Sequence, residues 1–349
     1  MTSVPEGQVL AGSAAGGAGG GVAWSLLRLA RPHQWVKGAF VLIGPIYAGR
    51  VTTTAELVAI CGAVLAFGFA SSACYVVNDL KDAEADRAHP RKRHRPIAAG
   101  LVGPGLAMGF AVGLLVMAGL AIAAVWQWGP GGVGSAGVAA ESGVLWLLLT
   151  LGLYVLNVLL YSFRLKHVVI MDVMCLALGF VLRVLGGCAA VMVEPSSWLL
   201  NVTFFVSMFL AFGKRLGERR LVGEMVAAAR GVQASYTDAL LQMVVVVTGV
   251  ATLLTYAGYV QAQADRYTYG FNLLWLTMLP ATYGLLRCIV LLEKGRFDDP
   301  TEIARKDRPF QLAGGLFVLM TAVLLWWFPM KNEGLHRAHS GTAVVGVGL

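Results

Sequence analysis

Long apolar segments recur along nearly the whole chain and restrict it to a fold that can sit in a lipid bilayer. An α-helix needs about 20 apolar residues to cross the hydrocarbon core. Nine segments are candidates, of which the first and the sixth are short: residues 38–49, 55–78, 104–126, 143–162, 168–192, 198–213, 239–261, 271–292 and 310–329. The sequence therefore predicts an all-α, polytopic membrane protein with nine transmembrane helices.

Composition favours one membrane-embedded domain over two soluble ones. Only 13% of the 349 residues are charged, whereas a soluble protein carries about 25%. We expect the membrane domain to cover residues 23–330, with an amphipathic run at residues 24–37 lying in the interface before the first span. Residues 1–22, rich in Gly, Ala and Ser, predict a disordered tail, and residues 331–349 predict a flexible one.

Basic residues occupy alternate predicted loops, which predicts the orientation of the chain. Most of the 27 Lys and Arg residues precede the first span or follow the second, fourth, sixth and eighth. Cytoplasmic loops of membrane proteins carry this excess, so we expect the N-terminus on the cytoplasmic side of the inner (plasma) membrane. The same bias accounts for the net charge of +8 without a nucleic-acid partner. The oligomeric state stays open, a homo-oligomer included.

The strongest local signal is a row of polar residues at the end of the second span. Asn78, Asp79, Asp82 and Asp86 fall at helical spacings, so a helix that continues past residue 82 puts all four on one face. Stacked carboxylates repel one another unless a cation lies among them, and Mg²⁺ takes carboxylates together with substrate phosphates. We therefore interpret Asp79, Asp82 and Asp86 as magnesium ligands for a diphosphate. The alternative is a solvated, charged helix end.

Cations follow the carboxylates directly, as binding of a phosphorylated substrate requires. The loop HPRKRHRPIAAG supplies Lys92 and Arg95, together with other basic residues. Further candidates lie at the same predicted face: Arg31, Gln34 and Lys37 before the first span, Tyr161 and Lys166 after the fourth, and Lys214 and Arg215 after the sixth. The alternatives for these three motifs are an interfacial anchor, a plain basic loop and a structural Lys214–Glu218 ion pair.

Some ionisable residues fall inside predicted spans, where such side chains are costly and usually serve a site. Asp172 and Arg183 lie in the fifth span, and Arg287 lies in the eighth. An ion pair between Asp172 and Arg183 would have to reach over three helical turns, so we do not assume it. We take Arg183 as a candidate substrate-binding residue.

Together these motifs resemble the UbiA superfamily of intramembrane prenyltransferases. The matching features are the nine helices, the NDxxDxxxD motif at residues 78–86 and the RPIAxG run at residues 95–100. The resemblance covers residues 28–328 and implies a UbiA-like helix bundle with its active site at the cytoplasmic side. It also implies Mg²⁺ as the cofactor and a substrate that carries a diphosphate.

One departure separates this chain from the aromatic prenyltransferases of that family. They carry a second Asp-rich motif after the sixth helix, whereas this chain has GKRLGE at residues 213–218, which is cationic with one carboxylate. Together with RPHQWVK, SFRLKH and the charged run at residues 305–308, the change looks like the decaprenyl-phosphate phosphoribosyltransferase branch. Such an enzyme holds a diphosphate, a ribose phosphate and a lipid phosphate, which needs more cations.

That branch implies Mg²⁺-dependent transfer of 5-phosphoribose from 5-phosphoribosyl 1-diphosphate to a polyprenyl phosphate within the lipid bilayer. The products are polyprenyl-phosphoryl-5-phosphoribose and diphosphate, a step toward arabinose donors for a cell envelope. The residues it implies as catalytic are Asp79, Asp82, Asp86, Lys37 and Lys214. The substrate-binding positions are Asn78, Arg31, Gln34, Lys92, Arg95, Tyr161, Lys166, Arg183 and Arg215. The sequence does not apportion the cations between the lipid phosphate and the ribose phosphate.

Two other functions stay open. An aromatic prenyltransferase that takes a polyprenyl diphosphate is disfavoured by the missing second Asp-rich motif. A transporter without chemistry predicts intramembrane repeats and charged residues along a path through the membrane. The sequence has no such repeat, and most of its charges lie on one predicted face.

Overall fold

Nearly all of the structure is helical, as the apolar segments predict. The computed structural model describes residues 21–88, 92–130, 138–222, 235–297 and 300–327, so both predicted tails lie outside the described residues except for Gly21 and Val22. Eight helices within these ranges are long and apolar enough to cross a membrane. They are α3 (Thr54–Lys81), α5 (Pro104–Trp128), α6 (Val138–Phe163), α7 (Met171–Ala190), α8 (Ser197–Val222), α10 (Asp238–Ala262), α12 (Met278–Glu293) with the preceding 3₁₀-helix η5 (Leu273–Thr277), and α14 (Arg308–Trp327).

The first predicted span, residues 38–49, is the one that the structure does not confirm. It folds as α2 (Ala39–Tyr47), a helix of nine residues with Pro45 inside. Nine residues rise about 14 Å, which is about half of the hydrocarbon thickness. The 3₁₀-helix η1 (Pro32–Gly38) leads into α2, and α1 (Val22–Ala30) precedes it with apolar side chains exposed, as an interfacial helix would have. The predicted count of nine transmembrane helices is therefore not confirmed in the described part of the chain.

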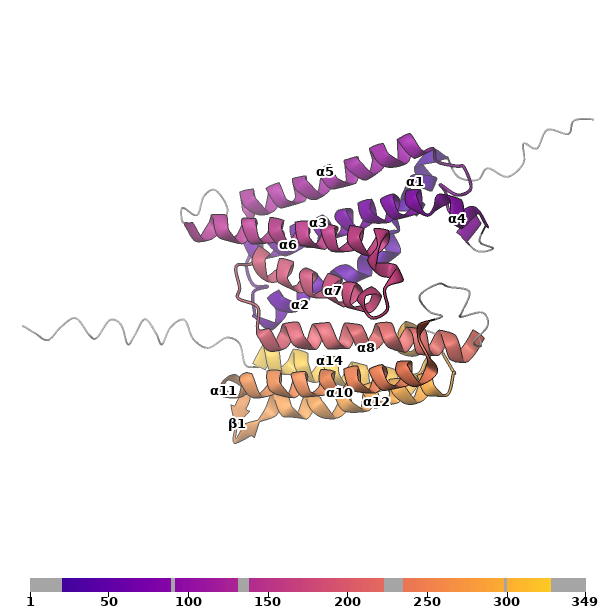
Figure 1. The fold of residues 1–349 in the computed structure, drawn as a ribbon. Coiled ribbons are helices and arrows are strands. Elements are labelled where there is room, and N and C mark those ends of the chain that lie inside the picture. The colour runs from indigo at the N-terminus through magenta and orange to yellow at the C-terminus, as the bar shows by residue number, and fades with distance from the viewer. Residues whose placement is uncertain (1–20, 89–91, 131–137, 223–234, 298–299, 328–349) are drawn as a thin grey trace, which may run out of the picture.

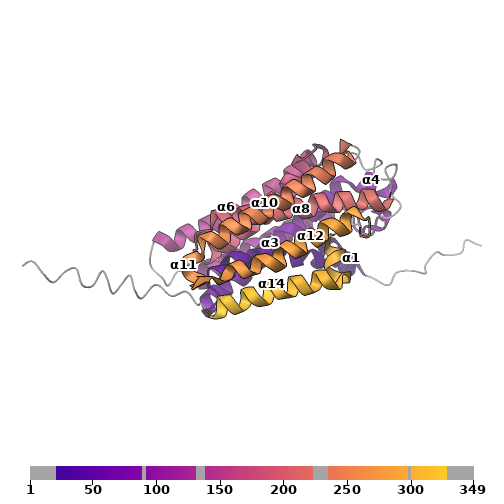
Figure 2. The ribbon, with the colours of Figure 1, turned by 90° about the horizontal axis from the view of Figure 1, so that it is seen from below.

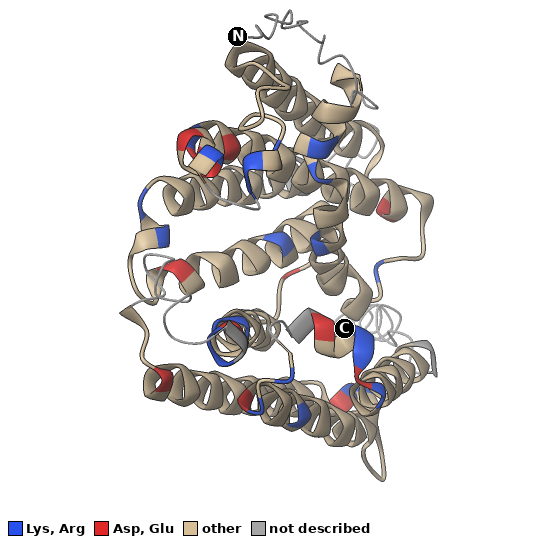
Figure 3. Cartoon of the chain, turned by 90° about the vertical axis from the view of Figure 1, so that its right-hand side faces the viewer, with Lys and Arg blue, Asp and Glu red and all other residues tan. Residues whose placement is uncertain are grey.

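Short elements lie at the two ends of the bundle (Figure 1). The end that carries α4 (Ala83–Ala88) is here named the charged end, because Lys, Arg, Asp and Glu lie around it in Figure 3. The other short helices are η2 (Lys92–His94), η3 (Leu165–His167), α11 (Ala264–Tyr267) and α13 (Pro300–Lys306). A hairpin of β1 (Thr268–Tyr269) and β2 (Phe271–Asn272), beside α11, is a small departure from the all-α prediction.

The long helices run side by side in two groups, with α7 between them. Figure 1 shows α3, α5 and α6 on one side and α8, α10, α12 and α14 on the other; the turned view in Figure 2 shows α14 beside α12. Helix α7 packs against α6 and α2 and also against α8. Side chains of α7 therefore reach both groups, which places Asp172 and Arg183 inside the bundle.

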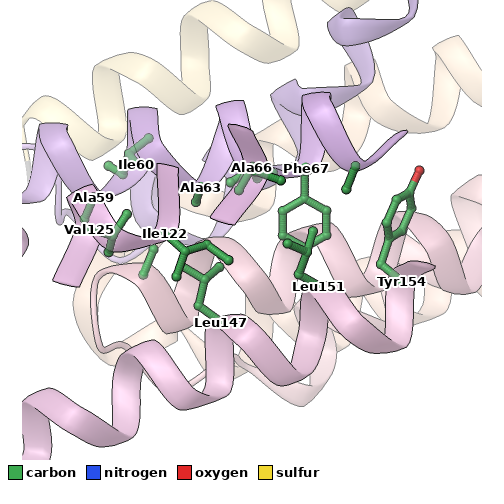
Figure 4. Close-up of a cluster of buried hydrophobic side chains, with 14 of the residues drawn as sticks. Ala59, Ile60, Ala63, Ala66, Phe67, Ile122, Val125, Leu147, Leu151 and Tyr154 are labelled. Carbon is green, nitrogen blue, oxygen red and sulfur yellow. The ribbon is translucent and has the colours of Figure 1, made fainter. Parts of the chain in front are cut away.

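Small side chains allow α3 to pack closely against its neighbours. Ala63 and Phe67 of α3 lie in one buried cluster with Ile122 of α5 and Leu147 of α6 (Figure 4). Helices in a bilayer associate by such close van der Waals packing, because lipid tails are as apolar as leucine. The packing fixes the axis of α3 and so the position of the polar residues at its end.

Gly187 lets α7 approach the backbone of α2, and its substitution is a test of this packing. A Cβ atom at Gly187 would lie 1.9 Å from the carbonyl oxygen of Val41. We expect Gly187→Ala to lower the melting temperature of the purified protein in detergent, because overpacking costs about 1–3 kcal/mol. Gly105→Ala is the control, since a Cβ there meets nothing within 4 Å. Equal melting temperatures for both variants would contradict the close approach of α2 and α7.

Candidate active site

The polar row at the end of α3 follows the predicted helical spacing but divides into two pairs. Helix α3 ends at Lys81, Asp82 has φ −88° and ψ 2°, and α4 begins at the next residue. Backbone hydrogen bonds still join the amide of Asp82 to the carbonyl of Asn78 and the amide of Asp86 to the carbonyl of Asp82. Asp79 and Asp86 form one pair, and Asn78 and Asp82 form the other. The prediction of one shared face is therefore only partly met.

Asp79 and Asp86 are joined through arginine. Their side chains are only 2% and 3% exposed, and Nη1 of Arg95 donates to Asp79 Oδ1 at 3.0 Å and to Asp86 Oδ2 at 2.7 Å. Nη2 of Arg31 contacts both carboxylate oxygens of Asp79, at 2.6 and 2.8 Å. Lys92 lies 3.8 Å from Asp86. Charge-assisted hydrogen bonds of this kind are stronger than those between neutral groups. They therefore hold both the RPIAAG loop and the start of η1 against α3.

Asp82 forms the more accessible part of the site. Its side chain is 24% exposed, and Nζ of Lys166 lies 2.9 and 3.0 Å from its two oxygens. Nδ2 of Asn78 donates to Asp82 Oδ2 at 3.2 Å. The structure thus brings Lys166, after α6, to the end of α3.

Cations hold each of the three carboxylates in this structure. Among the described residues, no three His, Cys, Asp or Glu side chains converge as a metal-binding group. The donors themselves suit Mg²⁺, which prefers hard oxygen ligands such as these carboxylates. Binding of a metal ion here therefore requires the Lys and Arg side chains to turn away from the carboxylates, as they would toward a phosphate.

A cavity of about 240 Å³, here named the inner cavity, lies between α3, α6, α7 and η1. Arg31, Lys37 and Arg183 line it together with Asn78 and Tyr161, and none of the described residues that line it is Asp or Glu. A wider cleft of about 570 Å³, here named the outer cleft, has Arg28, Arg31, Asp79 and Arg95 among its lining residues. Because Arg31 lines both, its guanidinium lies at the boundary between the cleft and the cavity.

Arg183 is a cation inside the bundle that neutral groups hold. The residue is 5% exposed, and its guanidinium donates to the carbonyl oxygen of Gly179 and to the hydroxyls of Ser71 and Tyr154, at 2.7–3.1 Å. Among the described residues no Asp or Glu forms an ion pair with it. A charge buried without a counter-charge is costly, so its place in the wall of the inner cavity favours an anionic ligand.

Arg215 pairs with Asp172, and the Asp172–Arg183 pair considered from the sequence does not form. Nη2 of Arg215 donates to Asp172 Oδ2, and the hydroxyl of Tyr236 donates to Asp172 Oδ1 at 2.7 Å. Burial is the main cause that raises the pKa of Tyr236 to about 12, so this hydroxyl keeps its proton at neutral pH. Asp172 is 1% exposed, and the hydrogen-bonded group ties α7 to α8 and to the start of α10.

The remaining predicted residues are less central. Gln34 is half-buried on η1, and Lys214 is exposed on α8 and lines neither the inner cavity nor the outer cleft. On the same helix turn Arg215 is half-buried and pairs with Asp172, and, like Lys214, it is not among the described lining residues of either space. Arg287, also noted from the sequence, forms an ion pair with Asp307 at 2.9 Å.

Sequence reasoning missed several residues that hold the site in place. Nε1 of Trp35 donates to the Ser72 hydroxyl at 3.0 Å, and that hydroxyl donates to the carbonyl of Ala30 at 2.6 Å. A Cβ at Gly68 would lie 3.1 Å from the Trp35 ring, so the glycine leaves room for the indole. These contacts fix η1, and with it Arg31, against α3. In the sequence, the small residues Gly68 and Ser72, one helical turn apart, were a weak indication of a close packing contact. Nothing in the sequence around Tyr236 indicated its role.

The chain matches a known family along most of its length. A sequence model of the UbiA prenyltransferase family matches residues 38–304. Two relatives are named decaprenyl-phosphate phosphoribosyltransferase, one from Corynebacterium glutamicum at 33% identity and one from Mycolicibacterium smegmatis at 35%. The first alignment covers 87% of this chain and 88% of the relative, and the second covers 82% and 88%.

The fold is similar to that of a UbiA homolog from Archaeoglobus fulgidus. Its structure bound to DMAPP and Mg²⁺ gives a TM-score of 0.62, and its structure bound to GPP and Mg²⁺ gives 0.60. Both are 18% identical to this chain, with 86% of this chain and 99% of that chain covered. At this identity the likeness shows the fold, which is UbiA-like.

Proposed function

The chain belongs to the UbiA prenyltransferase family, and from that membership we propose that it transfers 5-phosphoribose from 5-phosphoribosyl 1-diphosphate to a decaprenyl-like polyprenyl phosphate. The products are polyprenyl-phosphoryl-5-phosphoribose and diphosphate. The observation that carries the proposal is the match to two relatives named decaprenyl-phosphate phosphoribosyltransferase over more than four fifths of each chain. The three cations that line the inner cavity, whose described lining residues include no Asp or Glu, agree with substrates that carry several phosphates.

We propose Mg²⁺ as the cofactor, held by Asp79, Asp82 and Asp86 with Asn78 beside them. Bound Mg²⁺ supplies positive charge to the diphosphate leaving group. Asp82 is the most exposed of the three carboxylates, which makes it the first that a metal–diphosphate complex can reach. Its partner Lys166 then becomes available for a phosphate oxygen.

The cations that now contact the carboxylates have a second part in the proposal. Arg31, Arg95 and Lys166 each keep further N–H donors beyond those used in their ion pairs. Substrate phosphates compete with the carboxylates for these donors. In the transition state the same side chains neutralise the charge that grows on the diphosphate as its bond to the ribose breaks, which is the main catalytic need.

The transfer step is a displacement at the anomeric carbon of the ribose. An oxygen of the lipid phosphate forms the new bond to this carbon while the bond to the diphosphate breaks, and the diphosphate leaves with the electron pair. The configuration at the carbon inverts. Because the lipid phosphate is already an anion at neutral pH, no side chain has to remove a proton from it, and the protein contributes alignment and charge.

The lipid chain has a fitting place beside the cavity. An apolar groove of about 470 Å³ is lined by Phe40, Ile43 and Tyr47 of α2, with Phe317 of α14 across from them. Lys37 of η1 lies three residues before Phe40 of α2 and lines the inner cavity. We therefore assign Lys37 to the lipid phosphate, because a lipid bound there can extend its chain along α2 into the groove.

Two neighbouring glycines of α14 allow a test of whether the lipid chain lies in the apolar groove. Gly314 lines the apolar groove and Gly315 does not, and a Cβ at either position meets nothing within 4 Å. We expect Gly314→Phe to raise the KM for decaprenyl phosphate about tenfold, equal to about 1.4 kcal/mol, because the ring fills the groove. The KM for a short-chain prenyl phosphate should stay unchanged, as should both constants in Gly315→Phe. The same KM in both variants would place the lipid chain elsewhere.

We further place the charged end of the bundle at the cytoplasmic side of the plasma membrane. The basic loops gather there, as the positive-inside rule requires, and a water-soluble diphosphate reaches the outer cleft from that side. The product, a pentose phosphate on a lipid, suits the supply of arabinose donors to a cell envelope.

The deciding experiment is an assay of the purified protein with Mg²⁺, labelled 5-phosphoribosyl 1-diphosphate and a polyprenyl phosphate. We expect label in the lipid fraction that depends on Mg²⁺ and on the lipid. Absence of label there, together with transfer of a prenyl group from a prenyl diphosphate to an aromatic acid, would overturn the proposal in favour of an aromatic prenyltransferase. Inactivity with both substrate pairs would also count against it.

A further inference from the structure

The proposed transfer leaves one buried polar group at the charged end unexplained, the group formed by Asp172, Arg215 and Tyr236. Asp172 accepts hydrogen bonds from Arg215, from the Tyr236 hydroxyl at 2.7 Å and from the amide of Val173 at 2.9 Å. The Tyr236 hydroxyl in turn accepts a hydrogen bond from the amide of Ile170 at 2.7 Å. These hydrogen bonds link the Ile170 amide to Tyr236, and Tyr236 and the Val173 amide to Asp172. Asp172 in turn contacts the guanidinium of Arg215.

Both Nη atoms of Arg215 have hydrogen-bond acceptors, and its Cζ lies 5.8 Å from the ring centroid of Tyr236. Its Nη2 meets Asp172 and its Nη1 donates to the carbonyl of Ala211 at 3.1 Å, whereas its Nε is buried without a hydrogen-bond partner among the described residues. A buried donor on a charged group is costly when it has no acceptor. Since guanidinium groups match phosphate oxygens in geometry and charge, the Nε–H points to an anionic oxygen as its partner.

The backbone before Asp172 is also unusual. Ile170 has φ 70° and ψ −46°, a region that β-branched residues rarely adopt. The hydrogen bond from its amide to the Tyr236 hydroxyl holds this conformation. Strained backbone of this kind occurs where the surrounding structure fixes a side chain for a task, and the side chain that follows here is Asp172.

This group lies beside the inner cavity. Cys175, one helical turn after Asp172 on α7, lines that cavity, as does Tyr161 of α6. The segment that carries Asp172 also carries Lys166, the partner of Asp82. The connection after α6 therefore places Lys166 at the carboxylate site, and the start of α7, which follows it, places Asp172 beside Arg215.

We propose that Asp172 and Tyr236 are positioning residues that hold Arg215 so that its Nε–H edge binds a phosphate oxygen of a substrate. The inference rests on the proposed function and deepens it, because it names the residues that act behind one of the phosphate-binding cations. The phosphate belongs either to the ribose or to the lipid, since both are phosphate monoesters. Orientation before binding raises affinity, because less freedom is lost when the substrate arrives.

A role in holding the helices together does not account for the group by itself. Buried ion pairs add little to stability compared with well-packed apolar residues. An ion pair that only joined α7 to α8 would also leave two features unexplained, the Arg215 Nε–H without a hydrogen-bond partner among the described residues and the strained backbone of Ile170. A positioning role accounts for all three features.

The test measures the KM for each phosphate substrate and kcat in matched variants. We expect Arg215→Gln to raise one of the two KM values at least tenfold and to leave the other within twofold. Asp172→Asn should raise the same KM at least threefold. The double variant Asp172→Asn with Arg215→Gln should be no worse than Arg215→Gln alone, because Asp172 acts through Arg215. Tyr236→Phe, which removes a single hydrogen bond, should give a smaller rise in that KM and is the fallback if Asp172→Asn does not fold.

Asp238→Asn is the matched control. Asp238 accepts from Arg219 and Arg220 of the same helix α8, in an ion pair between α8 and α10. We expect both KM values of this variant to stay within twofold of wild type. The substrate whose KM rises in Arg215→Gln identifies the phosphate as that of the ribose or that of the lipid.

Three outcomes would overturn the inference. They are unchanged KM values in Arg215→Gln, a loss in Asp172→Asn that appears only as a lower melting temperature, and effects of Asp172→Asn and Arg215→Gln that multiply in the double variant. If the wild-type protein transfers no phosphoribose, the proposed function fails separately. The inference is then decided by the rise in melting temperature that inorganic phosphate causes in the wild type, which Arg215→Gln and Asp172→Asn should lose and Asp238→Asn should keep.

Discussion

Asp82→Asn should reduce the rate of phosphoribosyl transfer about 1,000-fold, equal to about 4 kcal/mol of transition-state stabilisation. Asp82 is the most accessible of the three carboxylates at the end of α3, and both of its carboxylate oxygens accept from Nζ of Lys166. The amide keeps the shape of the side chain and one acceptor oxygen but removes the charge that a divalent cation requires. Turnover of labelled 5-phosphoribosyl 1-diphosphate into the lipid fraction is the measurement.

Folding and position are controlled in the same experiment. Asp82→Asn should elute from gel filtration and melt like the wild type, because its side chain lies at the surface of the site. Glu84→Gln removes an equal charge two residues further on, from an exposed side chain of α4, and should keep full activity. A turnover of Asp82→Asn within tenfold of wild type would contradict a metal-binding role for this carboxylate.

Arg31→Gln should lower kcat/KM about 100-fold, equal to about 3 kcal/mol. The guanidinium contacts both oxygens of the buried Asp79 and lines both the outer cleft and the inner cavity. Glutamine has neither the charge nor the fork of donors that a diphosphate accepts, and lysine has the charge without the fork. Arg31→Lys should therefore recover less than tenfold of the loss. Steady-state kinetics with both substrates at several concentrations measures each effect.

Arg28→Gln is the matched control for Arg31. Arg28 lies on α1 and lines the outer cleft, but its guanidinium donates an exposed hydrogen bond of 3.3 Å to the carbonyl of His94 and contacts no carboxylate among the described residues. We expect its kcat/KM to stay within about threefold of wild type, because exposed charges are screened and contribute little. If both variants lose activity equally, the charge of the outer cleft as a whole matters, and the boundary position of Arg31 does not.

The apolar pattern predicted the long helices well, because each must satisfy its own backbone hydrogen bonds and cover about 30 Å of hydrocarbon. It was less reliable at residues 38–49. There the segment is apolar and folds as the short helix α2, with η1 before it. Gly44 and Gly187 allow α2 to pack directly on α7, so Val41 and Pro45 are buried inside the bundle and the segment does not have to span the bilayer.

The candidate site was predicted in kind and only partly in arrangement. Helical spacing brought Asp79 and Asp86 together, as both contact Arg95. The cation partners of the carboxylates were beyond the reach of spacing, because Lys166 lies 84 residues from Asp82 in the sequence and meets it only through the packing of α6 on α3. Sequence spacing can suggest a pair within one helix, such as Asp172 and Arg183. It cannot suggest the observed partner of Asp172, which is Arg215 on α8.

The sequence by itself determined that the chain is a helical membrane protein with its charges gathered at one end, since hydrophobic length and charge position follow from local composition. It also proposed the residue types of a candidate site. Tertiary structure decided which cation meets which carboxylate, that Arg31 lies between a cleft and a cavity, and that Arg215 pairs with Asp172. Those outcomes depend on helix rotation and distance across the bundle, which packing sets and which no local pattern encodes.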